Sequence, residues 1–299
     1  MSLEVFESDA KRLVDPAAEP ETIAEGFQFT EGPVWSFRHR HLTFVDLAGD
    51  AMYRWSEGSG TQVLRKPSEH ANGLAYDRSG ALVSCEHRTR RITRETSGGG
   101  LETVVDRYRG KRLNAPNDLV IAEDGTIIFT DPHYGLMEGY GGPGEQELPF
   151  RGVYRLPPGS SEPELIADDF EGPNGLALAP AEDRLIVVDS ERNHLREIRI
   201  DEGWRFSGGD VVVELPEEGE GVPDGVKLDE EGNIFTTGPG GLWLCTPRGA
   251  MLAHLPLPEV TANLAWGADG RTLHLTSSTT VSRLACKTSG HVPHRKWEA

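Results

Sequence analysis

Short apolar strands alternate with polar turns along this chain, and the alternation recurs as an imperfect repeat. Each repeat has a turn-like opening, a short apolar strand, a polar turn that usually contains Asp or Gly, and a second strand that ends in a small or acidic residue. The six segments are EGPVWSFRHRHLTFVD, ANGLAYDRSGALVSCE, PNDLVIAEDGTIIFTD, PNGLALAPAEDRLIVVD, PDGVKLDEEGNIFTTG and TANLAWGADGRTLHLTS. Their openings are spaced roughly 40 to 57 residues apart, close to the ~40 to 50 residues typical of propeller blades.

Further strands lie between these segments. The stretch LREIRI alternates apolar and charged residues as a half-exposed strand does, and VVVEL follows after a polar turn. Four short antiparallel strands per repeat predict an all-β fold, a single six-bladed β-propeller over residues 1–299 with a central channel. A closed ring leaves no exposed sheet edge, so we expect an N-terminal segment within residues 3–30 to pair with the last blade.

Composition and charge are typical of a turn-rich globular protein and argue against a nucleic-acid partner. The 299 residues include 35 glycines and 20 prolines, and aromatic residues make up 7%. The formal net charge of −18 argues against a nucleic-acid partner, which would need a concentrated basic face. The basic stretch CEHRTRRITR is short and interrupted, so we interpret it as a solvated strand and turn.

The cysteines and the N-terminal sequence favour a cytoplasmic protein. Cys85, Cys245 and Cys286 are widely separated and lack the spacing of zinc ligands, so we interpret them as buried thiols in a reducing compartment. The N-terminal stretch has acidic residues where a secretory signal needs basic ones, and no apolar window is long enough to span a membrane. We therefore expect a cytoplasmic location and no membrane partner, while the sequence leaves the oligomeric state open.

Oxygen-bearing side chains recur at the openings of the repeats. In a propeller the innermost strand of each blade lines the channel, and equivalent positions lie at one height around the axis. Four of these side chains, here called the axial quartet, can therefore converge from four blades: Glu31, Asn117, Asn174 and Asp224. Two carboxylates and two amide oxygens predict a central metal-binding channel for a hard divalent cation, Ca²⁺ first, with Mg²⁺, Mn²⁺ or Zn²⁺ as alternatives.

An ordinary explanation competes for each member of the quartet. Asn-Gly and Asp-Gly are common turn dipeptides, and for any single one of them turn chemistry is the better explanation. The quartet gains weight because its members lie in register in different repeats and because Glu31 departs from the Asn or Asp rule. Asn72 and Asn263 occupy related positions, and we interpret them as structural.

Residues that end the second strands should surround the same mouth of the channel. The candidate substrate contacts there are Asp131, His133, Tyr134 and Asp189, together with Asn117 of the quartet. For Asp131 and Asp189 the alternative is a turn that hydrogen-bonds its own backbone. The stretch HYGLMEGYGGPGEQELPFRG begins at this mouth and is either a lid or a plain surface loop.

The motifs EGPVW, PND, PNGLA, PDG and FTDPHYG occur together in this chain. On these motifs it resembles the family of senescence marker protein (regucalcin), gluconolactonase and luciferin-regenerating enzyme, and within it the bacterial gluconolactonase-type members. The resemblance implies a six-bladed propeller with a divalent cation, often Ca²⁺, in its central tunnel. It also implies hydrolysis of sugar lactones in several members.

The same resemblance assigns roles to the quartet. Glu31, Asn174 and Asp224 match the family's metal ligands, and Asn117 matches a position that contacts metal or substrate. The regucalcin branch has an Arg two residues before that Asn, whereas this chain has Ala115. The sugar contacts of regucalcin therefore do not carry over to this chain.

The quartet and the resemblance together predict a metal-dependent lactone hydrolase. The expected activity is that of a gluconolactonase-type sugar lactonase of carbohydrate metabolism, which opens an aldonolactone to the aldonic acid. Asp224 is the candidate general base, with Asp189 or His133 as alternatives, and the lack of a GxSxG elbow argues against a serine nucleophile. Two other functions stay open: an organophosphate-hydrolysing propeller and a non-catalytic calcium-binding or protein-docking propeller. The choice among aldonolactones, uronolactones and non-sugar lactones is open as well.

Overall fold

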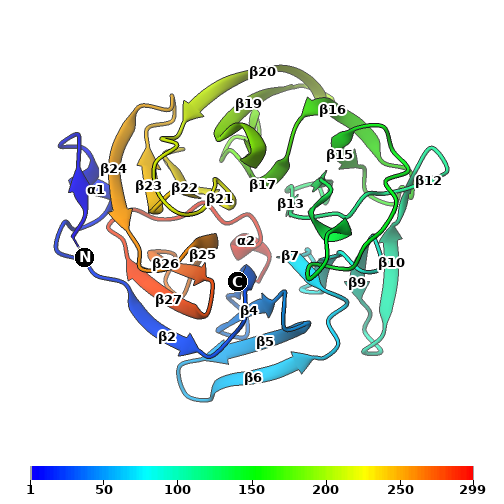
Figure 1. The fold of residues 1–299 in the computed structure, drawn as a ribbon, viewed down its shortest axis with the longest axis horizontal. Helices are drawn as coiled ribbons and strands as arrows, with labels where there is room; N and C mark the ends of the chain where they lie inside the picture. Colours follow the sequence, from blue (N-terminus) through cyan, green and yellow to red (C-terminus); the bar gives the residue numbers. More distant parts are fainter. Residues whose placement is uncertain (1, 299) are drawn as a thin grey trace.

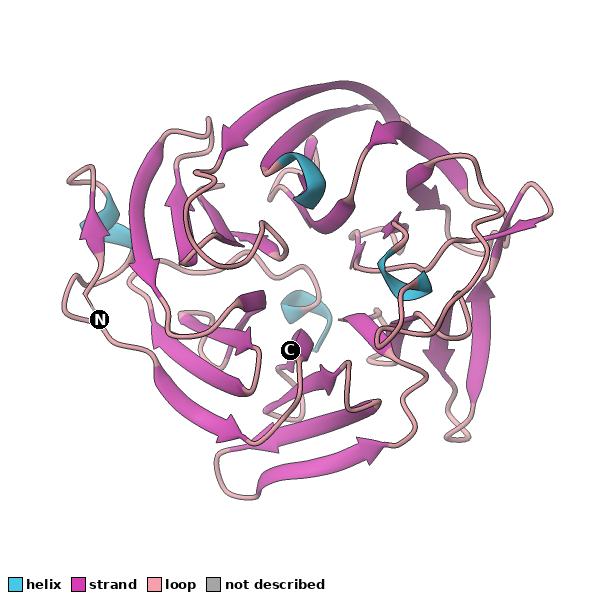
Figure 2. Ribbon diagram, in the orientation of Figure 1, coloured by secondary structure: helices cyan, strands magenta, loops and turns pink. Residues whose placement is uncertain are grey.

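The computed structural model describes residues 2–298, and in that range six small antiparallel sheets form a closed ring (Figures 1 and 2). The prediction of a six-bladed β-propeller is confirmed. Each sheet is one blade, and the strand that opens each sequence repeat lies nearest the central axis. The strands follow from the sequence pattern, because short apolar runs alternate with polar turns, many of which contain Gly, Asp, Asn or Pro.

The first three blades take up the chain from Thr30 to Phe170. Blade 1 consists of β3 (Thr30–Ser36), β4 (His41–Asp46), β5 (Ala51–Ser56) and β6 (Gly60–Arg65). Blade 2 consists of β7 (Ala71–Tyr76), β8 (Leu82–Glu86), β9 (Arg91–Glu95) and β10 (Leu101–Val105), and a small hairpin follows it, β11 (Arg107–Tyr108) and β12 (Lys111–Arg112). Blade 3 consists of β13 (Leu119–Ile121), β14 (Ile127–Asp131), β15 (Arg151–Leu156) and β16 (Glu164–Phe170), with the short 3₁₀ helix η1 (Tyr134–Leu136) in the long connection after β14.

The last three blades complete the ring. Blade 4 consists of β17 (Pro173–Leu178), β18 (Arg184–Asp189), β19 (His194–Asp201) and β20 (Arg205–Glu214), with η2 (Ser190–Arg192) after β18. Blade 5 consists of β21 (Val226–Leu228), β22 (Ile234–Gly238), β23 (Gly241–Cys245) and β24 (Met251–Pro256), and β1 (Glu4–Val5) adds a fifth strand at its outer edge. Blade 6 consists of β25 (Thr261–Gly267), β26 (Thr272–Ser277), β27 (Thr280–Ala285) and β2 (Glu21–Glu25). The helices α1 (Ala10–Leu13) and α2 (Arg295–Glu298) lie near the two ends of the chain.

The N-terminal segment closes the ring as predicted. Strand β2 pairs antiparallel with β27, from Glu21 opposite Arg283 to Glu25 opposite Thr280. The Arg283 guanidinium adds two hydrogen bonds to the Glu21 carboxylate across this pair, at 2.8 and 3.0 Å. The outer edge of blade 6 is therefore covered by the other end of the chain. The pairing of β1 with β24 was not expected from the sequence.

The core lies between neighbouring blades. The residues of β3, β7 and β25 are buried along their whole length, whereas the outer strand β6 is mostly exposed. Between blades 5 and 6, for example, Phe235 and Trp266 meet edge to face with ring centroids 4.9 Å apart. Since both faces of an inner strand are covered, its sequence is a continuous apolar run rather than an alternating one.

The innermost strands meet backbone to backbone at their starting residues. The amide of Gly73 donates to Asn117 O at 2.7 Å, and the amide of Gly175 donates to Asp224 O at 2.9 Å. A Cβ atom at Gly73 would lie 2.6 Å from Asn117 O, and one at Gly175 would lie 2.2 Å from Asp224 O. These glycines provide room for the carbonyl of the next blade. Neither has a φ in the left-handed region, so a glycine turn does not explain them.

A β-bulge lies at the start of the innermost strand in four of the blades. The pairing register shifts between Glu31 and Val34 in blade 1 and between Pro173 and Leu176 in blade 4, and blades 2 and 6 show a similar shift. A bulge releases backbone groups from the ladder within a blade and reorients the side chain at that point. In blades 2 and 4 the freed amides of Gly73 and Gly175 donate to the next blade.

Replacement of Gly175 by Ala tests the backbone contact between blades 4 and 5. The added Cβ would overlap Asp224 O, so we expect Gly175→Ala to lower the free energy of unfolding by about 1–3 kcal/mol. Gly98→Ala is the matched control, because a Cβ there meets nothing within 4 Å. Urea unfolding followed by tryptophan fluorescence measures both, and equal stability of the two variants would contradict the close contact.

Candidate functional site

A cavity of about 280 Å³ opens at the end of the channel where the innermost strands begin. All four members of the axial quartet line it, although they come from blades 1, 3, 4 and 5. The full lining is Phe29, Glu31, Leu47, Asn72, His87, Asn117, Tyr134, Met137, Tyr140, Asn174, Ser190, Glu191, Val222 and Asp224. The structure therefore brings together residues that lie up to 195 positions apart in the chain, from Phe29 to Asp224.

In three blades, the second strand ends in an Asp. The carboxylate of this Asp fixes the position of the segment that leads to a quartet residue. Asp131 accepts hydrogen bonds from the amides of Asn114 and Ala115 at 2.7 and 2.8 Å, just before Asn117. In the same way Asp189 accepts from the amides of Glu171 and Gly172, and Asp46 from those of Gln28 and Phe29. Each of these carboxylates satisfies two backbone donors that the strand ladder leaves free.

This placement differs from the substrate contact expected of Asp131 and Asp189. Both side chains are fully buried, and neither lines the cavity. His133 is also outside the cavity lining and lies against Tyr134, with ring centroids 4.8 Å apart. Tyr134 and Asn117 do line the cavity. Asp131 and Asp189 act on the site through the backbone, and the alternative drawn from turn chemistry describes them better.

Hydrogen bonds from residues outside the quartet fix the side chains of Glu31 and Asn174. Oε2 of Glu31 accepts from the amide of Gly32 at 2.9 Å and from Nδ2 of Asn263 at 3.1 Å. The Ser190 hydroxyl donates to Pro223 O, so its oxygen accepts from Nδ2 of Asn174 at 3.0 Å. Since Nδ2 of Asn174 is directed at Ser190, its Oδ1 remains available to the cavity. The structural role expected of Asn263 is consistent with its bond to Glu31.

The pKa values of both quartet carboxylates, Glu31 and Asp224, are raised. Burial raises the pKa of Glu31 to about 7, in spite of the hydrogen bonds from Gly32 and Asn263. Burial also raises the pKa of Asp224 well above its usual range, and the negative charges of Glu31 and Asp118 raise it further. Both carboxylates can be ionised together only if a positive charge joins them.

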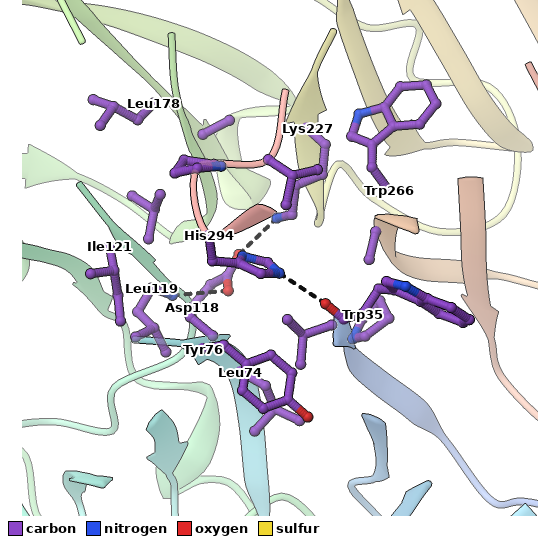
Figure 3. Close-up of a pocket in the computed structure, with 18 of the residues that line it drawn as sticks. Trp35, Leu74, Tyr76, Asp118, Leu119, Ile121, Leu178, Lys227, Trp266 and His294 are labelled. Carbon is purple, nitrogen blue, oxygen red and sulfur yellow. Dashed lines mark hydrogen bonds and ion pairs between the residues drawn. The ribbon is translucent and has the colours of Figure 1, made fainter. Parts of the chain in front are cut away.

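Among residues 2–298, no Lys or Arg side chain lines this cavity. Lys227 instead lies 3.7 Å from Asp118, measured from Nζ to Oδ2. Figure 3 shows this pair in the wall of a different cavity, where Asp118 also accepts from the amide of Leu119. A buried set of carboxylate and amide oxygens without a counter-charge fits a hard divalent cation.

The donor set also limits which metal the site suits. Among residues 2–298, no cluster of three or more His, Cys, Asp and Glu side chains has an arrangement that could hold a metal ion. Any cation here would therefore depend on the amide oxygens of Asn117 and Asn174 as well as on the two carboxylates. Amide oxygens favour Ca²⁺ or Mg²⁺ over soft transition metals.

A second, smaller cavity of about 90 Å³ is lined by residues further along the innermost strands (Figure 3). Its wall is mainly apolar, with Trp35, Tyr76 and Trp266 among its residues. The C-terminal segment packs across this side, where Nε2 of His294 lies 2.8 Å from Trp35 O. The quartet is therefore approached from the opposite end, through the larger cavity.

Several cavity residues were not predicted as ligand contacts. Phe29, Met137, Tyr140 and Val222 form an apolar part of the lining, and Met137 and Val222 are about half exposed, at 47% and 49%. Met137 and Tyr140 belong to the Gly-rich loop between β14 and β15, which the sequence placed at this mouth. The predicted position of this loop at the mouth indicated that it would contribute to the cavity. The sequence did not indicate which residues of the loop line it. Asn72, interpreted as structural, also lines the cavity.

With this geometry described, comparisons with known proteins identify the family. The model of the SMP-30/Gluconolactonase/LRE-like region matches residues 29–279. The chain belongs to this family. None of the helices within residues 2–298 is long and apolar enough to cross a membrane.

Individual relatives agree with that assignment. The chain is 32% identical to a gluconolactonase of Zymomonas mobilis over 306 residues, which covers 93% of this chain and 84% of the relative. It is also 32% identical to the structure of a gluconolactonase from Xanthomonas campestris, with a TM-score of 0.90 and coverage of 96% and 95%. A calcium-binding regucalcin from Agrobacterium tumefaciens shares the fold at 16% identity, with a TM-score of 0.77 and coverage of 92% and 96%.

Replacement of Asp189 by Asn tests its role in positioning the segment before Asn174. An Asn side chain can accept only one of the two backbone bonds and sets an NH₂ group against the other amide. We expect Asp189→Asn to lower the free energy of unfolding by about 1–3 kcal/mol. Asp168→Asn is the control, because Asp168 is exposed. Chemical denaturation measures both, and an Asp189→Asn protein as stable as the control would contradict the positioning role.

Proposed function

We propose that this chain is a divalent-cation-dependent lactonase of the gluconolactonase type, which opens an aldonolactone to the aldonic acid. The observation that carries the proposal is the convergence of a buried carboxylate (Glu31), a half-buried carboxylate (Asp224) and two amide oxygens in one open cavity. Lactone hydrolysis as the reaction is supported by gluconolactonases 32% identical over most of the chain. The free, buried cysteines Cys85, Cys245 and Cys286 support the cytoplasmic location that is part of this proposal.

The cation would be held by Glu31, Asn117, Asn174 and Asp224. We propose Ca²⁺ because the donors are all oxygen and two are neutral amides. When bound, such a cation polarises a carbonyl oxygen and stabilises the negative charge that develops on it. The residues behind the quartet, Asn263 and Ser190, keep its oxygens directed into the cavity by the bonds described above.

Asp224 is the proposed general base. Its carboxylate lines the cavity and so faces the space that the substrate and a water molecule would occupy. A water molecule would give a proton to Asp224 while its oxygen adds to the carbonyl carbon of the lactone. The ring C–O bond then breaks, and the leaving alkoxide takes up a proton to give the hydroxy acid.

A serine nucleophile is not supported by the cavity. Ser190 lines it, but its hydroxyl donates to Pro223 O and accepts from Asn174. The Ser190 proton is thus directed at a carbonyl and not at a basic side chain, which an activated serine requires. In the proposed reaction, water therefore attacks the lactone carbonyl directly.

Replacement of Asp224 by Asn tests the cation and the base together. We expect Asp224→Asn to keep the fold, to weaken Ca²⁺ binding and to lower kcat for D-glucono-1,5-lactone by about 100-fold or more. Asp210→Asn is the matched control, because Asp210 is exposed on β20. A pH-indicator assay gives the rate above spontaneous hydrolysis, calorimetry gives the Ca²⁺ affinity, and circular dichroism checks the fold.

The same assay separates this proposal from other functions. The wild type should release acid from the lactone, lose this activity with a chelator and regain it when one divalent cation is restored. Release of acid from a phosphotriester but not from sugar or simple lactones would indicate an organophosphate hydrolase. Binding of Ca²⁺ without turnover of any substrate would indicate a non-catalytic module, and a fully active Asp224→Asn protein would remove the base assignment.

A further inference from the structure

His87 has one ring nitrogen whose role is fixed by the backbone. It follows strand β8, its side chain is only 1% exposed, and it lines the cavity of the quartet. Nδ1 lies 2.8 Å from the carbonyl oxygen of Tyr140. A carbonyl oxygen can only accept, so Nδ1 carries the hydrogen. In this tautomer Nε2 presents a lone pair and is an acceptor.

Nε2 of His87 has no hydrogen-bond partner among the described residues, although it is buried. A buried acceptor without a donor costs stability, and natural structures rarely leave one without a reason. Because the ring belongs to the cavity wall, a ligand in the cavity is the available source of a donor. The donor group on that ligand must be an O–H or an N–H, because Nε2 can only accept.

The loop after β14 holds the His87 ring in place. A Cβ atom at Gly135 would lie 2.5 Å from His87 Cγ, and one at Gly141 would lie 3.0 Å from His87 Cβ. The loop backbone therefore packs on the imidazole at Gly135 and on Cβ of His87 at Gly141, and Tyr140 adds the hydrogen bond to Nδ1. An acceptor that cannot rotate away selects the position of its donor.

The imidazole also stays neutral at physiological pH. Burial lowers the pKa of His87 to about 4, and the nearby His70 lowers it in the same direction, while the bond to the Tyr140 carbonyl opposes the shift. Nε2 is thus a lone-pair acceptor across the neutral range. Such a weak base is poorly suited to removing a proton from water, which separates His87 from the role given to Asp224.

We propose that His87 is a specificity-determining residue whose Nε2 accepts a hydrogen bond from a hydroxyl group on the ring of the substrate. This inference rests on the proposed lactonase function and adds to it a residue that recognises the substrate: His87 favours lactones that carry ring hydroxyls over plain lactones. The Gly-rich loop is then a fixed wall of the binding site. Sites that hydrogen-bond a substrate hydroxyl discriminate strongly against the analogue that lacks it, because the buried partner is left unpaired.

Two substitutions separate the two nitrogens of His87. In His87→Asn the Nδ2 group can still donate to Tyr140 O, so the loop anchor is kept and the Nε2 acceptor is lost. In His87→Gln the Oε1 group can take the place of the Nε2 acceptor. His39→Asn is the control, because His39 is exposed in the turn after β3.

The first measurement is kcat/KM on D-glucono-1,5-lactone and on δ-valerolactone, which has the same ring size and no hydroxyl groups. We expect the ratio of the two values to fall by about 10-fold or more in His87→Asn, to be partly restored in His87→Gln and to be unchanged in His39→Asn. An equal loss on both lactones in His87→Asn would overturn the proposal and give His87 a purely structural role.

The second measurement does not need turnover. Nitrogen NMR of ¹⁵N-histidine protein follows Nε2 of His87 during titration with 1,5-anhydro-D-glucitol, which has the ring hydroxyls but no ester, and with tetrahydropyran, which has neither. We expect the Nε2 resonance to move with the polyol alone. No shift with the polyol, or an equal shift with both, would overturn the proposal. If no lactone is hydrolysed by the wild type, the proposed function fails on that result, and the NMR titration still decides whether His87 binds a hydroxyl.

Discussion

The site depends on one constraint, the direct backbone contact between neighbouring innermost strands at the residues where they begin. The amides of Gly73 and Gly175 donate to the carbonyls of Asn117 and Asp224 in the next blade, with no room for a Cβ between them. This contact sets the angle and height of each blade relative to its neighbour. Because the bonded carbonyls belong to quartet residues, the same contact that closes the ring also places the oxygen donors around the axis. Fold and site are therefore not separable at these positions.

The quartet is held at a cost to the folded protein. Burial raises the pKa values of both Glu31 and Asp224, and the negative charges of Glu31 and Asp118 raise that of Asp224 further. The lysine nearest the axis, Lys227, pairs with Asp118 instead. Such stored electrostatic strain is typical of functional sites, and a bound cation would relieve it. The aspartates at the ends of the second strands act differently: they are also buried, but they bind backbone amides and so fix the segments that lead to the quartet.

Polar and apolar parts of the cavity come from different structural sources. The quartet oxygens come from the blades, whose positions are set by the ring. The other wall comes from the loop after β14, which contributes Tyr134, Met137 and Tyr140 and packs on His87 through two glycines. Blades that are fixed by backbone contacts suit a constant chemical centre, whereas a loop can change without disturbing the ring. This division explains how one fold can keep its reaction and vary the ligand that it accepts.

The sequence by itself determined the repeat, the six blades, the closure by an N-terminal strand and the four oxygen donors, because these depend on local patterns that recur in register. It did not show that Asp131 and Asp189 bind backbone amides rather than face the cavity. Nor did it show that Asn72 lines the cavity, or that β1 extends blade 5. Each of these depends on which way a side chain or segment turns once distant strands have packed together. A repeat pattern specifies where a residue stands along its strand, but its neighbours across the ring are decided only when the tertiary structure closes.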